Sequence, residues 1–153
     1  MNSSLKHIGI IECNIFTLTP LLVAFYRHMP HRKRNLLYAY LLFPIVLHKP
    51  SQKLCTLNSR SRINRITDDA DIMAGFQDRL QFYKEYTNQC IQYAIECGAL
   101  VIDTELLTLT TGKQVKFYTN PKLEIALKVS NLLPKILKQD VVTTYIQFGI
   151  HQL

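Results

Sequence analysis

One run of apolar residues dominates the hydrophobic pattern of the chain, in the segment Asn35–Pro50 (NLLYAYLLFPIVLHKP). Eleven of the thirteen residues 36–48 are apolar, and the first charged residue is Lys49. Because such a helix has no polar face, we predict that it is the core helix, buried on nearly all sides. It is too short to cross a bilayer, which needs about twenty apolar residues. Pro44 is expected to kink or split it, because proline removes a backbone hydrogen bond.

Helices are also predicted on both sides of the core helix. Thr19–Pro20 has the chemistry of a helix start, and Pro30 ends this first helix after about ten residues. Residues 1–18 are then an N-terminal tail. The longest helix is predicted from about Asp69 to Cys97, because its apolar residues recur three and four positions apart. Gly98 suits the left-handed end of this helix.

Beyond the long helix the spacing of apolar residues changes to two, which is typical of strands. Ala99–Asp103 and Glu105–Thr110 are predicted strand segments. The turn Thr111–Lys113 (TGK) is expected to lead into Lys113–Tyr118, which completes a hairpin. The hairpin region therefore covers residues 99–118.

A last helical region closes the chain. Asn120–Pro121 has the same capping chemistry as the first helix, Pro134 interrupts the apolar pattern, and Gly149 ends it. The sequence shows no internal repeat and no low-complexity linker, so residues 1–153 are predicted to form one domain. Helices followed by a long helix, a glycine turn and a hairpin match the winged-helix plan, in which the hairpin is the wing. The predicted fold class is mainly α with a small β-hairpin, a winged-helix-like single domain.

Positive charge is concentrated in the first half of the chain, although the whole chain has a net charge of +7. Residues 1–67 hold ten Lys and Arg and one acidic residue, whereas residues 68–153 hold eight and ten. The excess lies mainly in two segments that flank the core helix, Arg27–Arg34 and Lys49–Arg65. Clustered cations attract nucleic-acid phosphates or an acidic protein surface, or they form only a solvated face that keeps the protein soluble. The candidate contact residues are Arg32, Lys33, Arg34, Lys49, Arg60, Arg62 and Arg65.

The sequence contains no motif for catalysis or for a cofactor or metal. It has no P-loop, GxSxG, HExxH or zinc-finger pattern, and its five histidines are scattered. The four cysteines include no CxxC pair, so we expect buried, reduced thiols. Asp68, Asp69 and Asp71 could ligate a metal, but the acidic first turn of a helix explains them more simply. We therefore expect a binding protein that is not an enzyme and that uses no cofactor.

The N-terminal segment carries no recognisable targeting signal. MNSSLKHIGIIECNIF has a short apolar patch broken by Glu12 and no small-residue cleavage site, so no signal peptide is predicted. Together with the shortness of the other apolar segments, this predicts a cytoplasmic protein without membrane contact.

Five features of the sequence follow one another in the order of a known family. They are a proline-led first helix, an apolar run ending in Leu-His-Lys-Pro, a Ser/Arg stretch, a helix–glycine–hairpin unit and a closing helix. They correspond to Thr19–Phe25, Leu47–Pro50, Ser59–Arg62, Cys90–Leu109 and Tyr145–Ile150. Over residues 15–150 the chain thereby resembles the middle components of bacterial ABC-three-component systems, including the small subunit of Lamassu-type defence systems. It departs from their pattern by starting the first helix with Thr-Pro instead of Asn-Pro, and by lacking an Arg-Pro pair at its end.

The resemblance implies a non-catalytic subunit of a complex that acts against phage or plasmids. In such systems an SMC-like ABC ATPase senses DNA, and an effector subunit, often a nuclease or other hydrolase, causes the damage. The middle component joins the two. The basic segments would then contact the DNA backbone, and apolar or hairpin surfaces would contact the protein partners. The alternative is a stand-alone winged-helix regulator, which would bind duplex DNA through a charged recognition helix.

Overall fold

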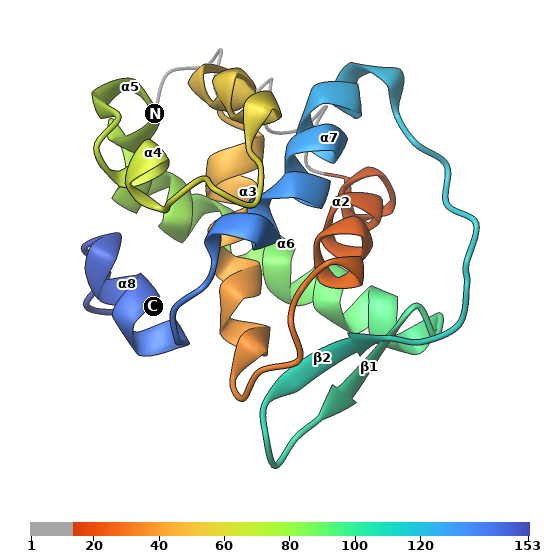
Figure 1. Cartoon of the computed structure of the whole chain (residues 1–153). Coiled ribbons are helices and arrows are strands. Elements are labelled where there is room, and N and C mark those ends of the chain that lie inside the picture. The colour runs from red at the N-terminus through yellow and green to blue at the C-terminus, as the bar shows by residue number, and fades with distance from the viewer. Residues whose placement is uncertain (1–13) are drawn as a thin grey trace.

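The structure is a computed structural model that describes residues 14–153. It confirms the predicted fold class, a mainly helical single domain with a small antiparallel hairpin (Figure 1). Within these residues no helix is both long and apolar enough to span a membrane. The α-helices are α2 (Ile15–Arg27), α3 (Ala39–Val46), α4 (Asn64–Thr67), α5 (Ala70–Met73), α6 (Phe76–Glu96), α7 (Glu124–Leu132) and α8 (Val141–Gln147). The short 3-10 helices are η1 (Asn35–Tyr38), η2 (Lys49–Thr56), η3 (Pro121–Leu123) and η4 (Leu133–Ile136), and the strands are β1 (Leu100–Asp103) and β2 (Thr108–Thr111).

The predicted core helix is formed by η1 and α3, which follow one another directly through the middle of the molecule (Figure 1). Every residue of α3 except Tyr40 is buried, and α3 packs mainly against α6. Pro44 lies inside α3 and does not split it. The helix ends at Val46, and Lys49–Pro50 starts the 3-10 helix η2, because proline fits the first turn of a helix.

Helix α2 begins at Ile15, earlier than predicted. Asn14 is its N-cap, because the Asn14 side chain accepts a 2.8 Å hydrogen bond from a backbone N–H of the first turn. Pro20 therefore lies inside the helix and not at its start. The predicted tail was wrong for residues 15–18, which are helical, and its residues 1–13 lie outside the part of the chain that the structure describes.

The predicted long helix over residues 69–97 is divided in two at Gly75. This glycine has a φ of +71°, a left-handed conformation that ends α5 and precedes α6. Arg79 from the first turns of α6 occupies the break. Its Nη2 donates to the carbonyl of Ile72 at 2.6 Å, and its Nε donates to the carbonyl of Pro44 at 2.9 Å. The break is thus stabilised by the same side chain that ties α6 to the core helix.

The hairpin follows α6 across Gly98, whose φ of +81° gives the left-handed helix end that the sequence predicted. Strands β1 and β2 pair with each other in antiparallel register. Asp103 makes the turn between them, because its carboxylate accepts hydrogen bonds of 2.9 and 3.1 Å from the backbone N–H groups of Glu105 and Leu106. The wing therefore covers residues 100–111 and not 99–118. The prediction that Lys113–Tyr118 completes the hairpin was wrong.

The hairpin is fixed to the start of the core helix. The buried side chain of Asn35 pairs with the backbone of Leu109 in β2, accepting from its N–H at 2.7 Å and donating to its carbonyl at 3.1 Å. Beside it, the N–H of Arg34 donates to the carbonyl of Leu106 at 2.8 Å. The Tyr26 hydroxyl donates to the Asn35 carbonyl at 2.8 Å. These contacts make the wing a fixed part of the domain.

Asn35→Ala is expected to destabilise the domain by about 2–4 kcal/mol, because two buried backbone groups of Leu109 lose their partner. Urea unfolding followed by circular dichroism measures the change. Asn64→Ala is the matched control, since Asn64 is exposed and its truncation should cost less than about 0.5 kcal/mol. Equal stability of the two variants would show that the wing does not depend on Asn35.

The last helical region is interrupted by a non-helical segment, Leu137–Asp140, between η4 and α8. The C-terminal part then folds back onto the first half of the chain. Tyr145 donates from its hydroxyl to the carbonyl of Leu37 at 2.5 Å, and the Phe148 ring stacks on that of Phe76 with centroids 5.2 Å apart. Helix α8 is thereby held against η1 and α6.

Candidate functional site

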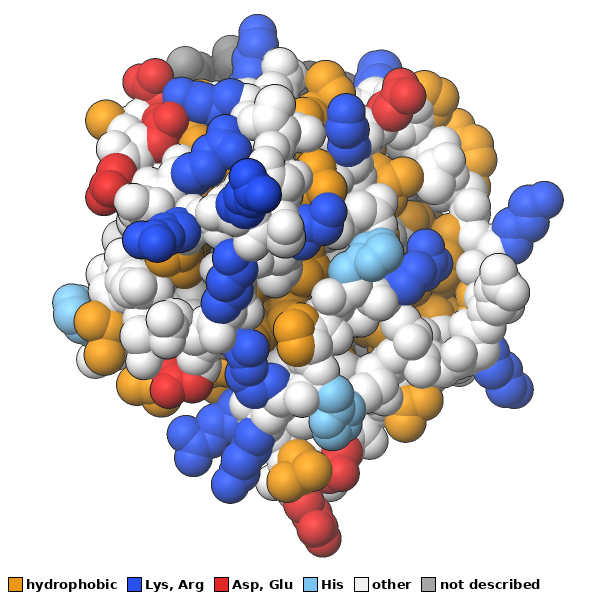
Figure 2. Space-filling model, in the orientation of Figure 1, with side chains coloured by type: hydrophobic (Ala, Val, Ile, Leu, Met, Phe, Trp, Pro, Cys, Tyr) orange, Lys and Arg blue, Asp and Glu red, His pale blue; other side chains and the backbone are white. Residues whose placement is uncertain are grey.

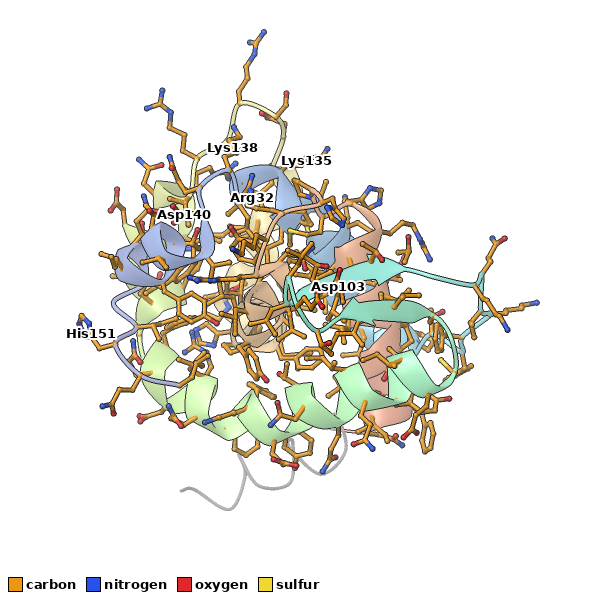
Figure 3. All side chains as sticks on the ribbon, turned by 90° about the horizontal axis from the view of Figure 1, so that it is seen from below. Arg32, Asp103, Lys135, Lys138, Asp140 and His151 are labelled. Carbon is orange, nitrogen blue, oxygen red and sulfur yellow. The ribbon has the colours of Figure 1, made fainter. Side chains whose placement is uncertain are left out.

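Lys and Arg side chains form a band across the side of the molecule that Figure 1 shows, from α4 and α5 to the loop between α2 and η1 (Figure 2). Seen from below, Arg32, Lys135 and Lys138 lie together on this side (Figure 3). Three separate parts of the chain supply the band: the loop after α2, the loop into α4, and the region of η4. We call it the basic face, and it consists of Arg32, Lys33, Arg34, Arg60, Arg62, Arg65, Lys135 and Lys138.

Lys138 joins the η4 region to the loop before α4. Its Nζ donates to the carbonyls of Ser59 and Ser61 at 2.8 and 3.1 Å, on either side of Arg60 in the sequence. Residues 57–62 of this loop are neither helix nor strand, and hydrogen bonds between Asn58 and Ser61 close a turn within them. The contact fixes Arg60 and its neighbours beside the C-terminal part of the chain.

Arg32 joins the loop after α2 to the same C-terminal region. Its Nη1 lies 3.0 Å from the carbonyl oxygen of Leu137 and 3.0 Å from the hydroxyl of Tyr38, and it also donates to the carbonyl of Gln139. The Tyr38 hydroxyl donates to the Gln139 carbonyl as well. Because these bonds already engage the Arg32 guanidinium, this residue positions the basic face.

The other predicted cations differ in whether their side chains are already hydrogen-bonded within the domain. Arg65 donates to the hydroxyl of Thr56 at 2.9 Å. Lys49 is exposed at the start of η2, so it lies at the other end of the core helix from Arg34 and outside the basic face. Among the cations of the basic face, five exposed side chains make no hydrogen bond or ion pair with another residue in 14–153: Lys33, Arg34, Arg60, Arg62 and Lys135.

A polar cleft of about 370 Å³ opens within the basic face, between the α4 region, η4 and α8. It is lined by Arg62, Ile63, Asn64, Ile136, Lys138, Gln139 and Gln147. Its polar side chains are cations and amides, all of which can donate hydrogen bonds, and none of the lining residues is acidic. This combination of donors suits an anion such as a phosphate group.

Reasoning from the sequence missed Lys135 and Lys138, because both fall in a stretch predicted as apolar helix. The available signal was Pro134, which breaks that helix. In the resulting turn Ile136 and Leu137 are buried, while the two lysines on either side of them are exposed. The break in the helix at Pro134 thus adds Lys135 and Lys138 to the basic surface that the sequence predicted from the two basic segments.

Helix α6 lies along the side of the molecule opposite Arg32, Lys135 and Lys138 (Figure 3). None of its exposed residues is basic, and three are acidic. The two cations of the helix, Arg79 and Lys84, are half-buried. We call this surface the α6 face, and its exposed residues are Gln77, Asp78, Gln81, Glu85, Asn88, Gln89, Gln92 and Glu96. The domain therefore has a basic side and an opposite side that is neutral to acidic.

The titratable groups His48 and Asp69, outside the basic face, make contacts that stabilise the fold. Within residues 14–153 no three His, Cys, Asp or Glu side chains converge as metal ligands would. His48 Nε2 lies 2.9 Å from the carbonyl oxygen of Asp71, at the edge of the core, and burial lowers the pKa of its ring. Asp69 caps α5 and pairs with Lys53 at 2.7 Å, and this contact holds the pKa of the carboxyl below its usual range. The predicted acidic helix start is confirmed at Asp69.

Cys90 is fully buried, and burial raises the pKa of its thiol to about 11, against 9.0 for an unperturbed thiol. Between these values the unfolded chain loses this proton and the folded chain keeps it, so stability falls as the pH rises, by about 1.4 kcal/mol per pH unit.

The raised pKa is tested with Cys90→Ala. Between pH 8 and pH 10.5 the free energy of unfolding in urea should decrease by about 2 kcal/mol less in this variant than in the wild type. Identical losses in the two proteins would contradict the raised pKa.

The fold and its surface define a small helical protein with a wing-like hairpin, a basic face and, on the opposite side, a helix face that is neutral to acidic. The chain belongs to the Middle Component 3 family of ABC-three component (ABC-3C) systems, since the model of that family matches residues 2–152. No curated protein and no solved structure matches the chain at a significant level. The resemblance to middle components of ABC-three-component systems is thus confirmed. A middle component of such a system has the other components as partners.

Proposed function

We propose that the chain is the non-catalytic bridging subunit of an antiphage and antiplasmid defence complex of the Lamassu type. In this complex it links an SMC-like ABC ATPase, which senses DNA, to an effector subunit that is a nuclease or another hydrolase. The observation that carries the proposal is the different chemistry of two opposite sides of one small domain, the basic face and the α6 face. A bridging subunit needs two separate contact surfaces.

The basic face supports contact with the DNA backbone that the ATPase holds. Its loops are fixed by the hydrogen bonds of Arg32 and Lys138, so the spacing of its exposed cations is set before binding. Pre-ordered cations lose less conformational entropy when they bind phosphates. Contacts of this kind position a protein on DNA without reading the base sequence. That behaviour suits a subunit whose complex responds to DNA in general.

The α6 face supports contact with a protein subunit. Asp78, Glu85 and Glu96 would repel phosphates but are acceptable in a polar protein interface. At one end of the helix Tyr93 packs edge-on against Phe16, with ring centroids 5.2 Å apart, and Phe16 is 58% exposed. Exposed aromatic side chains are enriched in protein interfaces.

The order of α6, Gly98 and the hairpin favours the alternative, a stand-alone winged-helix DNA-binding regulator. Such a regulator would insert α6 into the major groove, because the recognition helix directly precedes the wing. The exposed residues of α6 are acidic or neutral, and the wing carries Asp103 and Glu105 at its turn. Phosphates would repel both elements. The charges therefore favour the bridging subunit.

Size-exclusion chromatography with light scattering tests the proposal, using the ATPase and effector components of the same system. The ATPase and the effector should elute as one complex only when this chain is present. Their equally strong association without the chain would contradict a bridging role. Elution of the chain alone at micromolar concentration, in the presence of both, would contradict it as well.

A further inference from the structure

The segment Gln114–Thr119, between β2 and η3, has the side-chain pattern of a strand. Val115 and Phe117 are half-buried and pack against the core, whereas Lys116 and Tyr118 between and after them are exposed. The exposed fraction of Tyr118 is 73%, the largest among the exposed large apolar side chains of the described chain. Alternation with a period of two is that of a β-strand, and Val, Phe and Tyr are strand-forming residues.

Within residues 14–153 no strand pairs with that segment. The β1–β2 ladder continues only to Lys113, whose N–H donates to the carbonyl of Gly98 at 2.7 Å. From Gln114 to Thr119 no backbone N–H or carbonyl makes a hydrogen bond with another residue of the described part of the chain. Figure 1 shows the segment as a long arch on the outer side of the molecule, between β2 and α7.

A strand-like segment with unpaired backbone groups is a template for pairing with a strand of another chain. Six residues at about 3.3 Å each span about 20 Å, the length of an ordinary strand. Its alternate side chains are already anchored in the core through Val115 and Phe117, so little order has to be gained on binding. Lys113 and Lys116 give this stretch a positive charge without an acidic neighbour among residues 112–120.

We propose that Gln114–Thr119 binds an extended strand of a partner subunit by β-strand addition, with an acidic side chain of that strand beside Lys116. This inference rests on the proposed function, because it requires a protein partner. Strand addition explains why Lys113–Tyr118, which the sequence predicts to be a strand, pairs with no strand among the described residues. The second strand of that predicted pair is supplied by the partner.

The test compares two double variants, Lys116→Pro/Thr119→Pro and Lys116→Ala/Thr119→Ala. Both remove the same two side chains. Only the proline variant also removes two backbone N–H groups, which point to opposite edges of an extended segment. Neither N–H is hydrogen-bonded within the described chain, so the thermal unfolding of the two variants should agree. Affinity for the ATPase and effector components is measured by biolayer interferometry.

The proline variant should bind its partner at least about tenfold more weakly than the alanine variant. Equal affinities of the two variants would overturn the inference while leaving the bridging role intact. Failure of the wild type to bind either component would instead overturn the proposed function, and the inference with it. Hydrogen exchange of the wild type gives a readout that needs no variant: amides 114–119 should slow at least about tenfold in the complex. Unchanged exchange there would overturn strand addition.

Discussion

Leu42→Asp is expected to unfold the domain. Leu42 is 0% exposed in α3, the helix that packs against α6 at the centre of the molecule. An uncompensated carboxylate there costs several kcal/mol, or else the group takes up a proton and remains an unpaired polar group in the core. A domain has a total stability of only about 5–15 kcal/mol. Far-UV circular dichroism and urea unfolding should show a largely unfolded chain, and Val46→Asp should behave in the same way.

Val142→Asp is the matched control for this prediction. It introduces the same charge at an apolar helical position, but Val142 is 55% exposed and lies in the first turn of α8. A carboxylate near a helix N-terminus is compatible with the helix dipole, so stability should change by less than about 0.5 kcal/mol. A folded Leu42→Asp protein with normal stability would show that the core helix is exposed, as it would be at a binding surface.

Removal of four exposed cations from the basic face is expected to weaken DNA binding and to flatten its salt dependence. The variant replaces Lys33, Arg60, Arg62 and Lys135 by glutamine. The slope of log K against log salt concentration is negative, and each lost phosphate contact makes it less steep by about 0.9. The loss of four contacts should therefore make the slope less steep by about 3.6. Fluorescence anisotropy with duplex DNA over a salt series measures both quantities. Arg32 is left in place, because its hydrogen bonds hold the surface together.

A second variant separates the effect of position from that of net charge. It replaces four exposed lysines outside the basic face by glutamine: Lys113, Lys116, Lys122 and Lys128. Its net charge equals that of the first variant, yet its salt slope should stay near that of the wild type. Equal losses in the two variants would mean that only overall charge matters. An unchanged slope in the first variant would assign the basic face to an acidic protein surface.

Local sequence patterns predict those elements whose structure is determined by neighbouring residues. The core helix was visible because its apolar residues are contiguous, and the end of α6 was visible in Gly98. The errors concern competing local signals. Asn14, and not Thr19, caps α2, and Asp103 forms the turn that the sequence suggested for Thr111–Lys113.

Contacts between distant segments were not predictable from these patterns. Asn35 and Leu109 are 74 residues apart, and Arg32 and Gln139 are 107 residues apart. Clustering along the chain found most cations of the basic face. It could not show that Arg32 is engaged in hydrogen bonds, nor that Lys138 belongs to the same surface. Those facts depend on how the C-terminal part folds back.

The central claim is that the basic face contacts DNA while other surfaces contact protein subunits. Hydrogen exchange of the chain within the assembled complex, with and without duplex DNA, tests it most directly. DNA should slow exchange in residues 57–65 and 137–140, which carry or adjoin the basic face, and should leave the turn of the hairpin unchanged. Protection by DNA of α6 and the hairpin turn, with residues 57–65 and 137–140 unaffected, would contradict the claim and favour a winged-helix mode of binding.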